Sequence, residues 1–382
     1  MGIVTILLYI ASAWALRFLF NGLANPLRHV PGPYYTMFTK LPLKFHTLTA
    51  RRIYYINDLH EKYGDIVRIA PREVSCRDPS MFKEIHRVGG GFTKTEWYPK
   101  FIGIRKAEEH SIFSLGDPKQ HGARRKLLAR PFSKSELRRV WGEEVKAKVL
   151  YAVSRMKDSA GAQGGEVDVL HWWILMAADV ASRLAFGECF NMLETGKKHR
   201  YIEAVERIGF ISSLLAELPF LRWMQYTPSS AWKEAIASQK TIFEWAELAV
   251  ANSKKIGSTA NIFSGVMAEV EKGNGISTDQ NVRTDASTLI IAGSDTTAIT
   301  MTYIVWNVLS RPQLHQQLVA ELQLNLDDNL DDRQLEALPI MNAVIQETLR
   351  LHVAVPDTLP RHPPSGGISL GGYYIPENVT VV

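Results

Sequence analysis

The sequence predicts a mainly helical protein with a small β region, preceded by an N-terminal membrane helix. Three observations predict this fold class. Apolar residues recur at helical spacing over long segments such as residues 285–310. β-Branched residues gather briefly in residues 66–74, which is typical of short strands. Residues 3–20 are almost entirely apolar, within a chain of 382 residues whose 46% hydrophobic and 22% charged content describes a globular protein with a large core.

The N-terminal apolar stretch, residues 3–20, is about long enough to cross a thin bilayer at about 1.5 Å per residue. Arg17 can extend to the near surface of the membrane. No basic region precedes the stretch and no small-residue cleavage pattern follows it, which disfavours a cleaved signal peptide. Basic residues follow it, so the body is expected to face the cytosol. We therefore expect residues 1–25 to be an anchor and linker, and residues 26–382 to be one domain.

Three features follow the anchor. A helix is expected over residues 54–63, and two short strands are expected around a turn at Pro71. Residues 89–115 are rich in glycine and aromatic side chains and predict an irregular loop. Such a loop either covers a ligand or lies on the surface without a function.

Between Lys119 and Arg139 there are eight basic residues and one acidic residue. This density indicates a solvated face or a surface that binds anions. Nucleic acid is disfavoured as the partner because the excess is local and no nucleic-acid-reading motif accompanies it.

Further helices are expected over residues 167–190, 202–223 and 232–256. His171 in the first of them is interpreted as a packing residue. The apolar content of residues 202–223 implies a hydrophobic substrate or contact with the bilayer surface.

The helix over residues 285–310 is apolar around most of its circumference, so we expect it to lie inside the protein. A polar group containing Asp295 and Thr296 interrupts it, and an unpaired carboxylate is costly to bury. Small Ala292 and Gly293 would let a flat ligand approach the backbone, while the threonine can bond to a carbonyl one turn back and open the helix locally. A capped polar patch in an ordinary core helix is the alternative, and a second membrane span is disfavoured by the acid at its centre.

A helix follows Pro312, and another is expected over residues 340–351. On the second, Glu347 and Arg350 stand three residues apart and can form an ion pair. The same spacing occurs twice elsewhere in the chain, so by itself it is weak support for a site.

These motifs occur in an order that resembles the cytochrome P-450 monooxygenases. Ala-Gly-Ser-Asp-Thr-Thr is followed by Glu-Thr-Leu-Arg, then by Leu-Pro-Arg and a glycine-rich strand region. The resemblance extends over nearly the whole chain and implies the cytochrome P-450 fold. It implies that Asp295 and Thr296 deliver protons during oxygen activation. It also implies that Glu347 and Arg350 hold the core beside the haem.

The same resemblance assigns haem contacts. Arg125 and Arg361 match the arginines that bind the haem propionates. His121 stands where the family usually has a tryptophan, and it keeps an N–H donor. Ala292 and Gly293 match the part of the oxygen helix that the haem approaches.

The resemblance also implies partners. The remaining basic residues between Lys119 and Arg139 would form a docking face for an NADPH-dependent reductase. The N-terminal segment resembles the anchor and proline hinge of endoplasmic-reticulum members of the family. The overall pattern resembles fungal members that modify secondary metabolites, which implies a lipophilic substrate.

The axial cysteine of the family lies near the C-terminus in a Phe-x-x-Gly-x-Arg-x-Cys-x-Gly loop, and this sequence contains no match to it. Cys76 and Cys189 are the two cysteines, and we expect both to be half-buried, without a role as metal ligand. Two cysteines give no disulfide framework, which suits a reducing compartment.

The cytochrome P-450 fold is therefore expected to be incomplete at the C-terminus, and three interpretations remain. The first is a membrane-anchored monooxygenase whose C-terminus is completed elsewhere. The second is a truncated, inactive remnant that cannot ligate haem iron. The third is a haem-free binder of apolar ligands.

Overall fold

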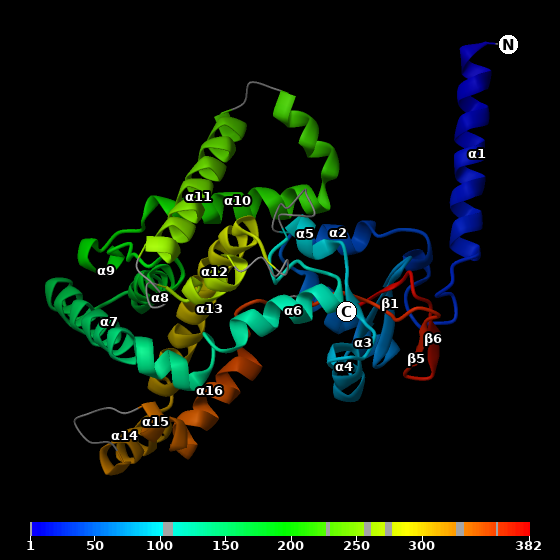
Figure 1. Ribbon diagram of the computed structural model, residues 1–382. Helices are drawn as coiled ribbons and strands as arrows, with labels where there is room; N and C mark the ends of the chain where they lie inside the picture. Colours follow the sequence, from blue (N-terminus) through cyan, green and yellow to red (C-terminus); the bar gives the residue numbers. More distant parts are fainter. Residues whose placement is uncertain are drawn as a thin grey trace.

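The computed structural model describes residues 2–101, 110–226, 230–255, 261–271, 277–325, 332–356 and 358–382. The expectation of a mainly helical protein with a small β region is confirmed, because helices fill most of the molecule and the strands gather near the base of α1 (Figure 1).

The helices of the first part of the chain are α1 Ile3–Leu23, η1 Tyr34–Met37, α2 Leu41–Leu48, α3 Arg52–Tyr63, α4 Pro79–His86, α5 Trp97–Phe101, α6 Pro118–Ala129, α7 Lys134–Ala162, α8 Val169–Phe186, α9 Met192–Thr195 and α10 Arg200–Glu217. They are followed by η3 Pro219–Tyr226, α11 Ser230–Lys255, α12 Ser264–Glu271, α13 Asp279–Leu309, α14 Pro312–Asn325, α15 Asp332–Ala337 and α16 Pro339–Leu351. The strands are β1 Ile66–Ala70, β2 Glu73–Cys76, β3 Thr93–Lys94, β4 Arg361–His362, β5 Ile368–Leu370, β6 Tyr373–Ile375 and β7 Thr380–Val381.

The sheet joins the two ends of the chain. Its five strands run in the order β1-β2-β7-β4-β3, and β5 and β6 form a separate hairpin. The two strands expected around Pro71 are confirmed as β1 and β2. Lys94 of β3 lies opposite Arg361 of β4 in an antiparallel pair. This pairing places two basic side chains from distant parts of the chain next to each other.

Helix α13 lies at the centre of the helical region and packs against α8, α11 and α16 (Figure 1). Ile290 and Ala298 on it are fully buried. The expectation that the whole helix lies inside is wrong for another face, where Tyr303 is exposed and Trp306 is 55% exposed. The reason is that the packed helices cover only part of its circumference.

Two boundaries differ from the sequence prediction. Helix α8 ends at Phe186, short of residue 190, because Gly187 adopts a left-handed conformation with φ of 79° and closes the helix. Residues 89–115 are less irregular than expected, since β3 and α5 lie within them; residues 102–109 lie outside the described part.

Among the described residues, α8 and α13 are long and apolar enough to cross a membrane by length and composition. Buried positions make up 61% of the apolar window in α8 and 17% in α13. In α1 the apolar part is the shorter segment Leu8–Leu23. Figure 1 shows α1 extending away from the rest of the molecule.

Candidate active site

Helix α6 carries the predicted haem contacts His121 and Arg125 one turn apart. The helix starts where the Asp117 carboxylate accepts a hydrogen bond from the Gln120 backbone N–H at 2.7 Å. The residue beside Arg125, Arg124, points inward instead and forms a buried ion pair with Asp285 of α13 at 2.5 Å. This pair, which the sequence did not indicate, fixes α6 against the N-terminal half of α13.

Four basic side chains converge beside α6. The pKa of His121 is lowered by burial and by the positive charges of Lys94, Arg125, Arg361 and Arg124, in that order. The pKa of Lys94 is lowered to about 8, by burial and then by Arg361. We call Lys94, His121, Arg125 and Arg361 the cation cluster.

The cation cluster has unused capacity for an anion. The Nε of Arg361 is buried and has no hydrogen-bond partner. Among the described residues, no carboxylate forms an ion pair with the cluster. Lys94, His121 and Arg361 are partly buried and Arg125 is exposed. Positive charges that lie close together without a counter-charge repel one another, so the cluster is suited to a ligand that brings carboxylates.

Lys94 and Tyr98 are members of this region that the sequence did not reveal. The Lys94 ammonium donates to the carbonyl oxygens of Ile112 at 2.9 Å and Phe113 at 2.7 Å. The Tyr98 ring is buried, with Lys94 Nζ at 5.6 Å and the Arg361 guanidinium at 5.7 Å from its centre. An aromatic ring thus holds two like charges close together.

Thr296 is arranged as the sequence predicts in one respect. Its hydroxyl donates to the Ala292 carbonyl oxygen at 2.5 Å, one turn back. The expected local opening of the helix is wrong, because α13 runs without interruption from Asp279 to Leu309. The Thr296 hydroxyl therefore bonds to the Ala292 carbonyl oxygen without breaking the helix.

The carboxyl of Asp295 lies near the charges of Glu206 and Lys198. One of its carboxylate oxygens is buried without a hydrogen-bond partner. The pKa of Asp295 is raised, first by burial and then by the negative charge of Glu206, while Lys198 opposes the rise. Successive helix residues project about 100° apart, so the carboxyl and the Thr296 hydroxyl do not share one direction.

The small residues at the centre of α13 are used differently from one another. Ala292 is exposed. A Cβ at Gly293 would lie 3.6 Å from the Ala181 Cβ of α8. Ala292 therefore lies on the exposed face of α13, and Gly293 lies on the face that packs against α8.

The ion pair predicted between Glu347 and Arg350 is present in α16, with bonds of 2.7 and 2.6 Å. The two side chains are 56% and 67% exposed. The pKa of Glu347 is lowered by its bond to Arg350.

Both cysteines are half-buried, as expected. Burial, followed by the charge of Asp78, raises the pKa of the Cys76 thiol to about 12. Burial also raises the pKa of Cys189, although the nearby Lys148 opposes the rise. Neither environment favours a thiolate.

Several basic residues between Lys119 and Arg139 are already paired with acidic residues of the same chain. Arg124 is paired with Asp285, and three other basic residues pair with acids on α7 or α15. The exposed basic residues without such a pair among the described residues are Lys119, Arg125, Lys126 and Arg130. The surface that could meet an acidic partner is therefore about half of what the sequence indicated.

Comparison with known proteins decides the family. The Cytochrome P450 family model matches residues 31–382. The chain belongs to the cytochrome P-450 family. It is 38% identical to Cytochrome P450 monooxygenase stcB of Emericella nidulans, over 94% of this chain and 69% of that protein. It is 36% identical to Cytochrome P450 monooxygenase aflV of Aspergillus parasiticus, over 98% of this chain and 75% of that protein. Methylphloroacetophenone oxidase of Cladonia uncialis is 30% identical, over 98% of this chain and 84% of its own length.

Membership of this cytochrome P-450 family implies haem, and the residues present fit one edge of it. The cation cluster, with the unpartnered Arg361 Nε, suits the two propionate carboxylates. The thiolate ligand has no such match, because burial raises the pKa of the thiols of Cys76 and Cys189. The cation cluster therefore fits the propionate edge of haem, and neither cysteine is assigned as the thiolate ligand of the iron.

Proposed function

We propose that the protein is a cytochrome P-450 monooxygenase that transfers one oxygen atom of dioxygen to a hydrophobic small molecule, with electrons from an NADPH-dependent reductase. The cation cluster is the observation that carries the proposal. It lies on α6 and the sheet, and the Arg124–Asp285 pair fastens α6 to the helix that carries Asp295 and Thr296.

In this proposal His121, Arg125 and Arg361 hold the haem propionates, as the resemblance implied. Lys94 adds a third positive charge to those of the two arginines, while the lowered pKa of His121 favours its neutral form. Ala292 and Gly293 would let the haem approach the backbone of α13, and Gly293 also lets α13 pack closely on α8. Haem with a cysteine thiolate supplies the centre that activates dioxygen.

Asp295 and Thr296 are proposed to supply protons. A carboxyl whose pKa is raised by burial can hold a proton nearer to neutral pH than an exposed one. The Thr296 hydroxyl has to leave the Ala292 carbonyl before it can donate elsewhere. Glu347 and Arg350 are proposed to hold the core beside the haem.

The substrate is proposed to be a lipophilic fungal secondary metabolite. The name of the relative from Cladonia uncialis refers to methylphloroacetophenone. An exposed apolar surface on α10 and η3, which includes Phe210, Phe220 and Trp223, is consistent with a hydrophobic ligand or a nearby bilayer.

Residues 1–25 are proposed to anchor the cytochrome P-450 domain, residues 26–382, to the endoplasmic-reticulum membrane with its body in the cytosol. Along α1 the side chains of Leu8, Trp14 and Phe20 are exposed. A helix of 21 residues, Ile3–Leu23, is about 31 Å long at about 1.5 Å per residue, which matches the hydrocarbon core.

Neither Cys76 nor Cys189 is proposed as the axial ligand. The alternative function follows directly: a protein limited to these residues would be an inactive remnant without thiolate-bound haem.

Reductase-supported turnover tests the proposed function. A chain extended by a cytochrome P-450 cysteine loop should consume NADPH and dioxygen in proportion to product, whereas the 382-residue chain should not. The spectrum of the reduced, carbon-monoxide-treated 382-residue chain should lack the red-shifted thiolate Soret band. Appearance of that band would show that Cys76 or Cys189 reaches the iron.

A further inference from the structure

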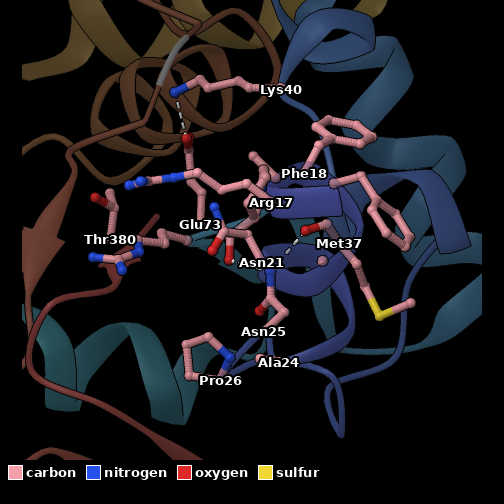
Figure 2. Close-up of a pocket in the computed structure, with 15 residues that line it drawn as sticks. Arg17, Phe18, Asn21, Ala24, Asn25, Pro26, Met37, Lys40, Glu73 and Thr380 are labelled. Carbon is pink, nitrogen blue, oxygen red and sulfur yellow. Dashed lines mark hydrogen bonds and ion pairs between the residues drawn. The ribbon is translucent and has the colours of Figure 1, made fainter. Parts of the chain in front are cut away.

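A second site lies apart from the proposed haem site, in a hollow between the base of α1 and the sheet. Its volume is about 660 Å³. Figure 2 shows that it has two chemically different sides. Lys40, Glu73 and Thr380 line one side, and the apolar side chains of Phe18 and Met37 line the other.

Close packing builds the hollow and fixes α1 beside it. A Cβ at Gly22 would lie 2.0 Å from the Phe38 ring, so only glycine lets the ring rest on the backbone of α1. The Asn25 side-chain amide donates to the carbonyl oxygens of Met37 at 2.9 Å and Pro71 at 2.8 Å. The hollow is therefore part of the fold and not a chance gap beside a loose helix.

The charges that line the hollow do not cancel. Lys40 pairs with Glu73 at 2.5 Å, and this carboxylate also contacts Arg52 at 3.3 Å. Arg17 and Arg72 also line the hollow, and both are exposed. Neither is paired with a carboxylate among the described residues. Two guanidinium groups without a carboxylate partner thus line one hollow, and a guanidinium binds phosphate oxygens in pairs.

The position of Arg17 indicates where the anion comes from. Arg17 lies six residues before the end of α1 at Leu23, or about 9 Å along the axis. Residues 3–16 extend about 21 Å beyond it on the membrane side of the proposed anchor. Trp14 beside it is 75% exposed, and tryptophan favours the membrane–water boundary. The long side chain of Arg17 can extend from inside the span toward the end of α1, where Asn21, Ala24 and Pro26 line the hollow. The hollow therefore lies at the level of lipid headgroups.

We propose that this hollow binds the headgroup phosphate of an anionic phospholipid. The guanidinium groups of Arg17 and Arg72 contact the phosphate oxygens, and the Asn21 amide and Thr380 hydroxyl add neutral donors. The acyl chains lie along Phe18 and the rest of the apolar surface of α1. The proposal rests on the membrane anchor and is independent of the haem chemistry.

Native mass spectrometry of the full chain in micelles with equal amounts of phosphatidic acid and phosphatidylcholine tests this site. We expect one phosphatidic acid to be retained preferentially. Arg72→Gln and Arg17→Gln should each reduce that preference about fivefold, the effect of one basic residue near an anionic lipid. Arg28→Gln is the matched control, because Arg28 is exposed, follows α1 and does not line the hollow. It should leave the preference unchanged.

Equal retention of the two lipids would overturn the proposal, and so would an equal loss in Arg28→Gln and Arg72→Gln. Displacement of the lipid by millimolar inorganic phosphate would show a site for free anions and contradict the lipid assignment. Flotation with phosphatidylcholine vesicles measures the anchor separately. Variants that still float but lose the preference support the lipid site, whereas a wild-type chain that does not float contradicts the anchor on which it rests.

Discussion

At the scale of single residues, burial controls the chemistry that each side chain can perform. Asp295 has a raised pKa because its carboxyl is partly removed from water near Glu206. Lys94 has a lowered pKa because it is buried beside Arg361. A raised carboxyl pKa and a lowered ammonium pKa thus occur among the residues proposed for one site, and such shifts are typical of functional sites.

Thr296→Ala in an enzyme completed with the cysteine loop should uncouple electron use from product. Loss of one proton-transfer group reduces the catalysed step by roughly 10²-fold or more, so NADPH oxidation should continue with peroxide as the main product. Thr297→Ala is the control, since Thr297 is the exposed neighbour on the same helix. Peroxide per NADPH measures the effect. Unchanged coupling in Thr296→Ala would refute the relay.

Cys76 should react slowly with iodoacetamide. Its pKa rises from 9.0 to about 12, a difference of three units, so the thiolate population near pH 8 falls roughly a thousandfold. Mass spectrometry of the native protein should show alkylation of Cys76 only after denaturation. Rapid modification of the native chain would show that the thiol is accessible and ionised.

At the scale of elements, the site depends on helices and strands that are distant in sequence. Arg124 on α6 and Asp285 on α13 are 161 residues apart, and their side chains are 6% and 8% exposed. The Asp285 carboxylate also accepts the Ile112 backbone N–H at 2.6 Å. One buried carboxylate therefore joins α13, α6 and the segment that Lys94 holds.

Arg124→Met should destabilise the protein by about 3–5 kcal/mol, because it leaves the Asp285 carboxylate buried without its partner. The double variant Arg124→Met with Asp285→Leu should cost less, since both charges are removed together. Urea unfolding of the wild type, both single variants and the double variant measures the coupling. Equal, additive losses would mean that the pair does not act as a unit.

At the scale of the whole molecule, local patterns were predictable and distant pairings were not. The spacing of apolar residues predicted α13 and α16, and the turn at Pro71 predicted β1 and β2, because these signals lie within one short segment. The Lys94–Arg361 neighbourhood and the Arg124–Asp285 pair depend on contacts between distant segments, which spacing does not encode. The exposed face of α13 was missed because periodicity does not show which neighbours cover a helix.

Removal of residues 1–20 should shift the protein from the membrane pellet toward the soluble fraction. The exposed apolar surface of η3 should keep part of it bound. Fractionation with alkaline carbonate separates the two outcomes. A shortened chain that remains fully embedded would show that another helix spans the membrane, with α13 the first to test.

The central claim is that the cation cluster holds the two carboxylates of haem beside α13. Titration of the 382-residue protein with haem and with haem dimethyl ester, followed in the Soret band, tests it without any need for a thiolate. The ester should bind at least about tenfold more weakly to the wild type, since charge-assisted bonds from Arg125 and Arg361 are lost. In the variant with Arg125→Gln and Arg361→Gln the difference between the two ligands should become several-fold smaller, because only Lys94 and His121 of the cation cluster remain. Equal affinity of the wild type for haem and its ester would contradict the claim.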